Sequence, residues 1–278
     1  MNEANKPAVS GQWQRIDQTG SANSFVAYLD RGASLLREER LQLTQLLEFE
    51  PGCSVLDVGS GAGEFLIEAA SSVEDIRAVG IDVSEAMVAV ATSRAREAGV
   101  SVEFRLGDAQ RLDFPDATFD RVNCSRVLVH LDDPGAAIAE MTRVLAPGGR
   151  VGISEPDFDA VMIDSDDLEI ARAVRRHLAD ALRNPDIGRR LRRLLLDAGL
   201  EILHLAGTIR SMPDLETVVH QFHLRDHLDS AVRAGDVGRD WGEAWWRGLE
   251  AADAAGRFFI GGVLYRAVAT KPVAPATH

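Results

Sequence analysis

The chain has 278 residues, of which 46% are hydrophobic and 26% are charged, a composition typical of a soluble globular protein. This length allows one large α/β domain with additions. The formal net charge of -13 argues against a nucleic-acid partner, because a phosphate backbone requires a basic surface. No stretch reaches the ~18 apolar residues of a membrane span, and residues 1–14 lack the apolar core of a secretory signal. We therefore expect a cytoplasmic protein that acts on a small molecule.

The N-terminal region divides into two parts of different composition. Residues 1–20 are polar and rich in Asn, Gln, Ser and Gly, which predicts a disordered tail in front of a domain spanning 21–278. Residues 22–48 repeat apolar side chains at helical spacing, so we expect cap helices before the first strand. Tyr28 lies in this segment, where it would either face a ligand site or pack between helices.

The central region alternates short apolar runs with amphipathic segments. Strands are expected at 53–58, 76–82, 101–106, 119–124 and 149–155, and helices at 62–71, 84–98 and 134–146. Ser84 is suited to cap the second of these helices. Such alternation predicts a parallel sheet with helices on both faces, in which ligands bind beyond the carboxyl ends of the strands.

The last third of the chain holds more elements than a minimal α/β domain needs. Helices are expected at 167–183 and 186–198, and strands at 201–209 and 258–270. Between these two strands lie the 46 residues 211–256, whose apolar side chains have helical spacing. Because long insertions commonly carry function, this insert is our candidate for a helical lid over the substrate.

Residues 55–63, Val-Leu-Asp-Val-Gly-Ser-Gly-Ala-Gly, are the most informative run of the chain. They place Asp57 at the end of a strand, before glycines that let a ligand approach the backbone. A second strand ends on Asp82, nineteen residues after Gly63, where an acid can accept hydrogen bonds from a ribose. Asp57 and Glu64 would repel a pyrophosphate, so a nicotinamide-dependent oxidoreductase is the weaker alternative. The acidic loop suits the ammonium and sulfonium of S-adenosylmethionine better.

Later motifs continue the pattern in order. They are Gly107-Asp108-Ala109 after the third strand, residues 114–122 before and into the fourth, Cys124-Ser125-Arg126 at its end, and residues 145–150 before the fifth. Together with residues 55–63 they resemble class I S-adenosylmethionine-dependent methyltransferases acting on quinones and secondary metabolites, over residues 40–156. The resemblance implies a Rossmann-like, doubly wound α/β fold. Its seven-stranded sheet would be mostly parallel with an antiparallel last strand, and a helical lid would be added.

The resemblance also implies the cofactor, S-adenosyl-L-methionine, and the residues that bind it. Asp82 would bind the ribose, and Asp108 would contact the amino group of the adenine. No metal is expected. The full cofactor-binding set is Asp57, Gly59, Ser60, Gly61, Gly63, Asp82, Val83, Met87, Gly107, Asp108, Ala109, Ser125 and Arg126.

Glu155 is the first catalytic candidate, because it lies at the end of the expected fifth strand, where the family holds its acceptor. Its carboxylate would take a proton from the acceptor or stabilise positive charge on it. The alternative is a structural loop acid that bonds to the backbone or to Arg126. Methyl transfer depends mainly on holding the nucleophile in line with the methyl group, so a base is needed only where the acceptor must lose a proton.

His220, His223 and His227 of the insert are spaced to share one face of a helix. They would line the pocket with His223 or His220 as a base, bind a metal ion, or form a half-buried helix surface. His223 is the second catalytic candidate.

Two further clusters each have two interpretations. Trp241, Trp245 and Trp246 would wall an aromatic substrate or pack inside the insert. The arginines of residues 189–193 would bind an acidic group or form a solvated helix face, and we favour the solvated face.

The function expected from this evidence is transfer of a methyl group to carbon or oxygen of a small acceptor of natural-product or quinone type. Such enzymes serve secondary metabolism, including antibiotic biosynthesis. The alternative is a member of the same fold that binds the cofactor but catalyses a cyclisation or another rearrangement. The acceptor, its reacting atom and the oligomeric state are left open by the sequence.

Overall fold

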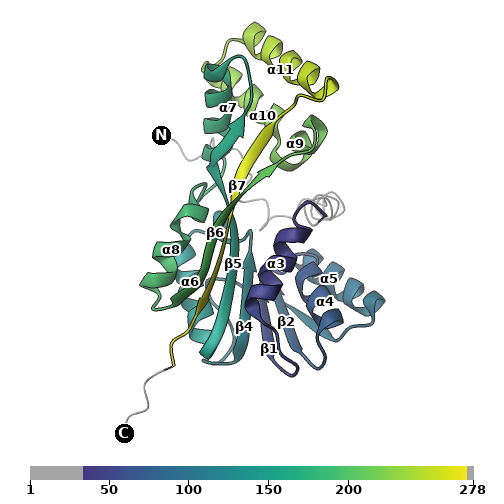
Figure 1. The fold of residues 1–278 in the computed structure, drawn as a ribbon, viewed down its shortest axis with the longest axis vertical. Coiled ribbons are helices and arrows are strands. Elements are labelled where there is room, and N and C mark those ends of the chain that lie inside the picture. The colour runs from purple at the N-terminus through teal and green to yellow at the C-terminus, as the bar shows by residue number, and fades with distance from the viewer. Residues whose placement is uncertain (1–33, 274–278) are drawn as a thin grey trace.

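A seven-stranded sheet runs through the structure, with helices on both faces and a helical lobe beyond one end (Figure 1). The structure is a computed structural model that describes residues 34–273. The expected tail 1–20, the first part of the cap helices and Tyr28 lie outside the described residues.

The strand order is β3-β2-β1-β4-β5-β7-β6, and β7 runs antiparallel to both of its neighbours. The order reverses between β1 and β4, which is where a doubly wound sheet opens a crevice for a ligand. The predicted Rossmann-like fold with an antiparallel last strand is confirmed. The strands are β1 (Ser54–Val58), β2 (Arg77–Asp82), β3 (Val102–Leu106), β4 (Phe119–Ser125), β5 (Leu145–Ile163), β6 (Glu201–Ser211) and β7 (Ile260–Thr270).

The fifth strand is much longer than the prediction of 149–155, and the motif of residues 145–150 belongs to it. The strand begins with Leu145 beside Phe119 of β4 and continues to Ile163 beside β7. The Pro-Gly-Gly run misled the sequence analysis because those residue types usually mark turns. Here Gly148 donates its N–H to the carbonyl of Lys271 at 2.7 Å, so the segment is held beside the end of β7. As a consequence Glu155 lies in the interior of the strand and not at its end.

Two groups of helices cover the two faces of the sheet. One face, called the α3 face below, carries α3 (Arg37–Leu47), α4 (Glu64–Ser72) and α5 (Glu85–Ala98). The other, called the α8 face, carries η3 (Leu128–His130), α6 (Pro134–Val144) and α8 (Ile187–Asp197).

Alternation along the strands assigns side chains to these faces. Val55 of β1 packs in the core under α3, whereas Leu56 and Val58 pack in the core under α6 and α8. Asp57 therefore falls on the α3 face. The same reasoning places Asn123 of β4 there, because it pairs directly with Asp57.

The helical lobe consists of α7 (Leu168–Asp180), α9 (Leu215–Phe222), α10 (Leu224–Ala234) and α11 (Arg239–Ala254). It stands on the far ends of β5, β6 and β7, which extend beyond the other strands and stay paired with one another up to the lobe (Figure 1). It has a core of its own, to which β5 contributes Val161 and β7 contributes Ile260. The insert expected over 211–256 thus holds three helices. Its action as a lid stays a prediction.

Two of the three tryptophans of the insert pack inside the lobe, which favours the packing interpretation over a wall of the substrate pocket. Trp245 and Trp246 are buried in the core of the lobe, and the indole of Trp245 donates to the hydroxyl of Ser165 at 2.6 Å. Trp241 is 71% exposed.

Gly188 lies where α8 approaches the sheet closely enough to exclude a side chain, so a substitution there tests this packing. A Cβ at this position would lie 2.6 Å from the ring of Tyr265 and 2.9 Å from the carbonyl oxygen of Glu155. Gly188→Ala should therefore lower the free energy of unfolding by about 1–3 kcal/mol, measured by urea denaturation. Gly248→Ala is the matched control, because nothing lies within 4 Å of its Cβ, and it should stabilise α11 by about 0.5–1 kcal/mol. Equal effects of the two substitutions would contradict the close packing of α8.

Candidate active site

The loop Gly59–Gly63, called the glycine loop below, is clamped to the end of β2. Its first two N–H groups both donate to the carbonyl of Ile81 at 2.8 Å. One carboxylate oxygen of Asp82 accepts the N–H of Gly61 at 2.9 Å, and the other accepts the N–H of Ser84 at 3.0 Å. Asp82 therefore joins the glycine loop to the start of α5, where Ser84 caps the helix as predicted.

Asp57 is a buried acid beside this loop, with 3% of its surface exposed. The side-chain amide of Asn123 donates to its Oδ1 at 2.6 Å. Burial raises the pKa of Asp57 to about 7; the Asn123 hydrogen bond lowers that pKa, and the charges of Asp82 and Glu64 raise it further. A carboxylate in this state would gain most from a nearby cation.

The residues of the glycine loop fit S-adenosylmethionine. Gly59 has a φ of +72°, and a Cβ there would lie 2.3 Å from the side chain of Val127, so only glycine leaves this approach open. The hydroxyl of Ser60 is buried without a hydrogen-bond partner among the described residues. Asp57 offers a charge partner for an ammonium, and Asp82 offers acceptors for ribose hydroxyls.

The rest of the predicted adenine side lies around the ends of β2 and β3. Val83 is 48% exposed, whereas Met87, in the first turn of α5, is fully buried. Gly107 donates its N–H to the carbonyl of Asp82 at 2.9 Å, which brings the Gly107-Asp108-Ala109 motif beside the end of β2. Asp108 is exposed and accepts the N–H of Gln110 at 2.8 Å. Next to it, Ala109 is buried.

The end of β4 contributes the last predicted cofactor residues. The hydroxyl of Ser125 donates to the Asn123 side chain at 3.2 Å, so it extends the hydrogen-bond chain that begins at Asp57. Arg126 has a φ of +60° and donates its N–H to the carbonyl of Ser154 at 2.8 Å. The left-handed turn at this residue sends the chain away from the sheet and into η3.

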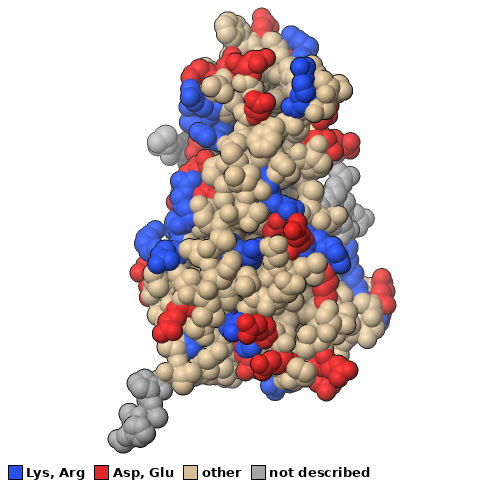
Figure 2. All heavy atoms as spheres, viewed as in Figure 1, with Lys and Arg blue, Asp and Glu red and all other residues tan. Residues whose placement is uncertain are grey.

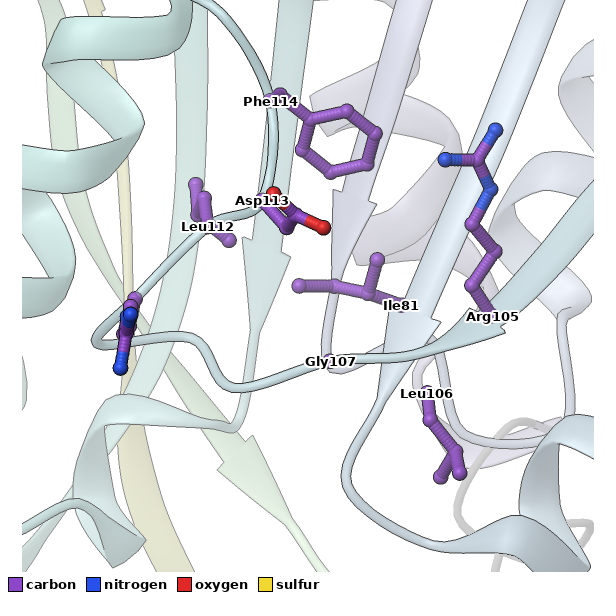
Figure 3. Close-up of a pocket in the computed structure, with 8 residues that line it drawn as sticks. Ile81, Arg105, Leu106, Gly107, Leu112, Asp113 and Phe114 are labelled. Carbon is purple, nitrogen blue, oxygen red and sulfur yellow. The ribbon is translucent and has the colours of Figure 1, made fainter.

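A hollow beside the end of β3 and the segment that follows it is separate from this site (Figure 3). Of the predicted cofactor-binding residues it contains only Gly107, and the Arg105 side chain on its wall is paired with Glu103 at 2.6 Å. The hollow is lined by Ile81, Arg105, Leu106, Gly107, Arg111, Leu112, Asp113 and Phe114.

Glu155 lies on the α8 face and is fully buried. Its Oε1 accepts the N–H groups of Val127 and Leu128 at 2.8 and 2.7 Å, and its Oε2 has no hydrogen-bond partner among the described residues. Burial raises its pKa to about 7, although the backbone donors and the charge of Arg126 lower that pKa. These contacts are those of the structural acid that formed the second interpretation of this residue.

The three histidines of the insert do not share a helix face, so that prediction is wrong. His223 has a φ of +50° and ends α9 where α10 begins, which breaks the expected single helix. The side chains of His220 and His223 are each 49% exposed, whereas His227 is buried. Among residues 34–273 no cluster of three or more potential ligands could hold a metal ion.

The arginine run of α8 is only partly the solvated face that we favoured. Arg189 forms an ion pair with the buried carboxylate of Asp157. Arg190 bonds to Asp186 at 3.2 Å, whereas Arg192 and Arg193 are exposed. The run therefore helps to fasten α8 to β5.

Four polar residues on the α3 face were missed by the sequence analysis: Asn123, Ser154, His204 and Arg266. Strand pairing places Asn123 beside Asp57, and Ser154 beside both Ser125 and Arg266. The available signal was a polar side chain in the middle of an otherwise apolar strand, because such a residue needs a partner or a ligand.

The comparison with known families decides the class of this site. The model of a methyltransferase domain matches residues 49–196. The chain belongs to this methyltransferase family. The methyltransferase therefore uses S-adenosylmethionine as its cofactor, in agreement with the fit of the glycine loop, Asp57 and Asp82.

Relatives of the methyltransferase include proteins with and without a named activity. An uncharacterized 37.1 kDa protein in transposon Tn4556 of Streptomyces fradiae is 38% identical over 248 residues, covering 88% of this chain and 70% of that protein. The 27-O-demethylrifamycin SV methyltransferase of Amycolatopsis mediterranei is 36% identical over 146 residues, covering 50% of this chain and 53% of that enzyme. The structure of the cyclase SpnF is 28% identical with a TM-score of 0.53, covering 84% of this chain and 80% of that one.

No helix of residues 34–273 is both long and apolar enough to cross a membrane. Basic and acidic side chains are interspersed on the face shown in Figure 2, which has no continuous basic surface.

Binding of the cofactor should depend on pH through Asp57. Because the pKa of Asp57 in the folded protein, about 7, lies above its ordinary value of 3.8, the folded protein retains a proton between these values, and its stability should fall as pH rises from about 4 to about 7. A bound cation favours the carboxylate, so the affinity for S-adenosylmethionine should rise with pH up to about 7, by at most tenfold per pH unit. Calorimetry between pH 5 and 8, in buffers of different ionisation enthalpy, measures the affinity and the released proton.

The matched variants for this test are Asp57→Asn and Glu155→Gln. Both remove a buried acid whose pKa is raised to about 7, but only Asp57 lies on the α3 face beside the glycine loop. Asp57→Asn should weaken binding and abolish its pH dependence, whereas Glu155→Gln should preserve that dependence. An unchanged pH profile in Asp57→Asn would exclude Asp57 as the partner of the ammonium.

Proposed function

We propose that the protein transfers the methyl group of S-adenosylmethionine to an oxygen or carbon of a small acceptor of natural-product or quinone type. The observation that carries this proposal is the buried Asp57 carboxylate, which among the described residues accepts a hydrogen bond from the neutral amide of Asn123 and forms no ion pair. It lies on β1, where the strand order reverses toward β4, so its carboxylate would be available to the ammonium of the cofactor.

Two further observations favour a small acceptor. The helical lobe stands beyond the carboxyl ends of the strands, where it can cover a small molecule. The net charge of -13 disfavours a nucleic acid. The rifamycin relative modifies a natural product, which supports an oxygen acceptor and a role in secondary metabolism such as antibiotic biosynthesis.

The chemistry places few demands on the protein. When bound, S-adenosylmethionine supplies a methyl group activated by its positively charged sulfur. The protein must hold the cofactor, position the acceptor and exclude water. Asp57, Asp82 and the glycine loop would serve the first task. Ser125 and Ser154, adjacent on β4 and β5, are placed to contact the acceptor.

We assign Glu155 a positioning role in this scheme. Its two hydrogen bonds to Val127 and Leu128 hold the start of η3 against the sheet, and Val127 in turn packs over Gly59. His223 remains the candidate for a base, if an acceptor needs one. From the lobe it would have to reach the sheet by closure of the lobe.

A cyclisation within the same fold is the second candidate function. The similarity to the cyclase SpnF supports it, because the chain is similar to that protein over 84% of its length. The two reactions differ in their products. Methyl transfer consumes the cofactor in proportion to product, whereas a cyclisation leaves it intact.

Mass spectrometry of products formed with methyl-labelled S-adenosylmethionine separates the two functions. We expect the label to enter one product per demethylated cofactor when the protein is incubated with a panel of phenolic, quinone and macrolide acceptors. A product of unchanged mass, formed without loss of cofactor, would establish the cyclisation instead. Failure to bind S-adenosylmethionine by calorimetry would refute both.

Glu155→Gln tests the positioning role directly. The glutamine side-chain oxygen can still accept both N–H groups, so turnover at saturating acceptor should stay within about threefold of wild type. Glu155→Ala removes the acceptor for two buried donors and should lower the free energy of unfolding by about 1–3 kcal/mol. A fall in kcat of about 10²–10⁴ in Glu155→Gln, with unchanged cofactor affinity, would instead make Glu155 a catalytic acid or base.

A further inference from the structure

Arg266 is a buried arginine in the middle of β7. It pairs with Ser154 of β5 and Ala206 of β6, and its neighbour Val268 packs in the core under α3, so its side chain points to the α3 face. It is 8% exposed, and its Nε has no hydrogen-bond acceptor in the described part of the chain. Within residues 34–273 it forms no ion pair with a carboxylate. A buried guanidinium in this state is costly unless an anion reaches it.

Neighbouring arginines on the same side of the sheet are neutralised. Arg210 of β6 pairs with the buried carboxylate of Glu39 at 2.8 Å, and Arg40 of α3 pairs with Glu68 at 2.7 Å. The second oxygen of Glu39 has no hydrogen-bond partner among the described residues, and Glu39 forms no ion pair with Arg266. Within the described part of the α3 face, the positive charge of Arg266 is therefore not neutralised by a carboxylate.

His204 adds an unused donor beside Arg266. It pairs with Val268, so it shares the α3 face, and it is two positions from Ala206, the partner of Arg266 on β6. Its Nε2 is buried without a partner among the described residues. Burial and the positive charge of Arg266 lower the pKa of His204, which keeps the imidazole neutral and able to donate one N–H.

Arg266 and His204 lie on the same face of the sheet as the predicted cofactor residues, toward its β7 and β6 side. Ser125, Ser154 and Arg266 are successive partners on β4, β5 and β7, one pleat beyond Asp57 and Asn123. With ~4.8 Å between strands, Arg266 lies roughly 10 Å from Ser125, about the length of a small aromatic molecule.

We propose that Arg266 and His204 form a carboxylate-binding subsite, so that the acceptor is a small organic acid held by its carboxylate at β7 with its nucleophile toward β4. The planar guanidinium suits a carboxylate, which it can bind with two parallel hydrogen bonds. This inference rests on the proposed function, because it names the class of acceptor for the same site.

Benzoate and benzamide are the probes that test the subsite, because they share shape and differ in charge. In the presence of S-adenosylhomocysteine, benzoate should raise the melting temperature of the wild-type protein in a concentration-dependent way, and benzamide should not. Calorimetry then gives the dissociation constant for benzoate.

Arg266→Gln should weaken benzoate binding about 10- to 100-fold, because a charged hydrogen-bond donor is lost. Its melting temperature without benzoate should stay the same or rise, since the substitution removes an unpaired buried charge. His204→Phe should weaken benzoate binding severalfold. Arg192→Gln, on the exposed side of α8, is the matched control and should bind benzoate as the wild type does.

Equal stabilisation by benzoate and benzamide, no stabilisation by either, or benzoate binding that persists in Arg266→Gln would overturn the subsite. The affinity of each variant for S-adenosylhomocysteine separates this failure from that of the proposed function. Intact cofactor binding without a benzoate effect refutes the subsite alone. Selective benzoate binding in a protein that transfers no label to any carboxylic acceptor refutes methyl transfer and leaves the subsite standing.

Discussion

The pairing register of the central strands is the constraint on which the site depends. Because β1, β4, β5 and β7 are paired in register, every second side chain of each strand falls in a common row on the α3 face. One row holds Asp57 and Asn123, and the next holds Ser125, Ser154 and Arg266. A slip of one residue in any strand would turn its polar groups into the apolar core under α8. The apolar residues that fix the register therefore also fix the chemistry of the opposite face.

The two ends of these rows carry buried charges of opposite sign that do not neutralise each other. Asp57 and Arg266 stand on strands three spacings apart, which at ~4.8 Å per spacing is roughly 14 Å. Neither has an ion-pair partner among the described residues, and an uncompensated buried charge opposes folding. Stability given up in this way is common where a protein must receive a charged ligand. The arrangement suits a cation at β1 and an anion at β7, with the reacting atoms between them.

The sequence predicted the fold and the identity of the cofactor well, because both depend on local patterns, whereas the individual cofactor-binding residues stay a prediction. Alternating apolar runs define the strands, and the glycine loop with Asp82 is contiguous or at fixed spacing. Prediction failed where distant pairing decides. The length of β5 comes from its antiparallel partner β7, which overrides the turn propensity of Pro-Gly-Gly. His223 adopts a left-handed conformation that helical spacing could not reveal. The position of Arg266 on the α3 face follows only from its pairing with β5 and β6, which are distant in the sequence.

Asp57 and Glu155 show why a perturbed acid is not by itself a catalytic group. Burial raises the pKa of both to about 7, so titration alone would rank them equally. Their surroundings differ. Asp57 accepts from a side-chain amide on the face that carries the glycine loop, whereas Glu155 accepts from two backbone groups on the closed α8 face. A carboxylate bound to backbone donors holds a turn in place, and one facing a ligand loop is available to a cation. The side of the sheet on which each acid falls, set by strand alternation, thus distinguishes an acid held by backbone donors from an acid beside the glycine loop.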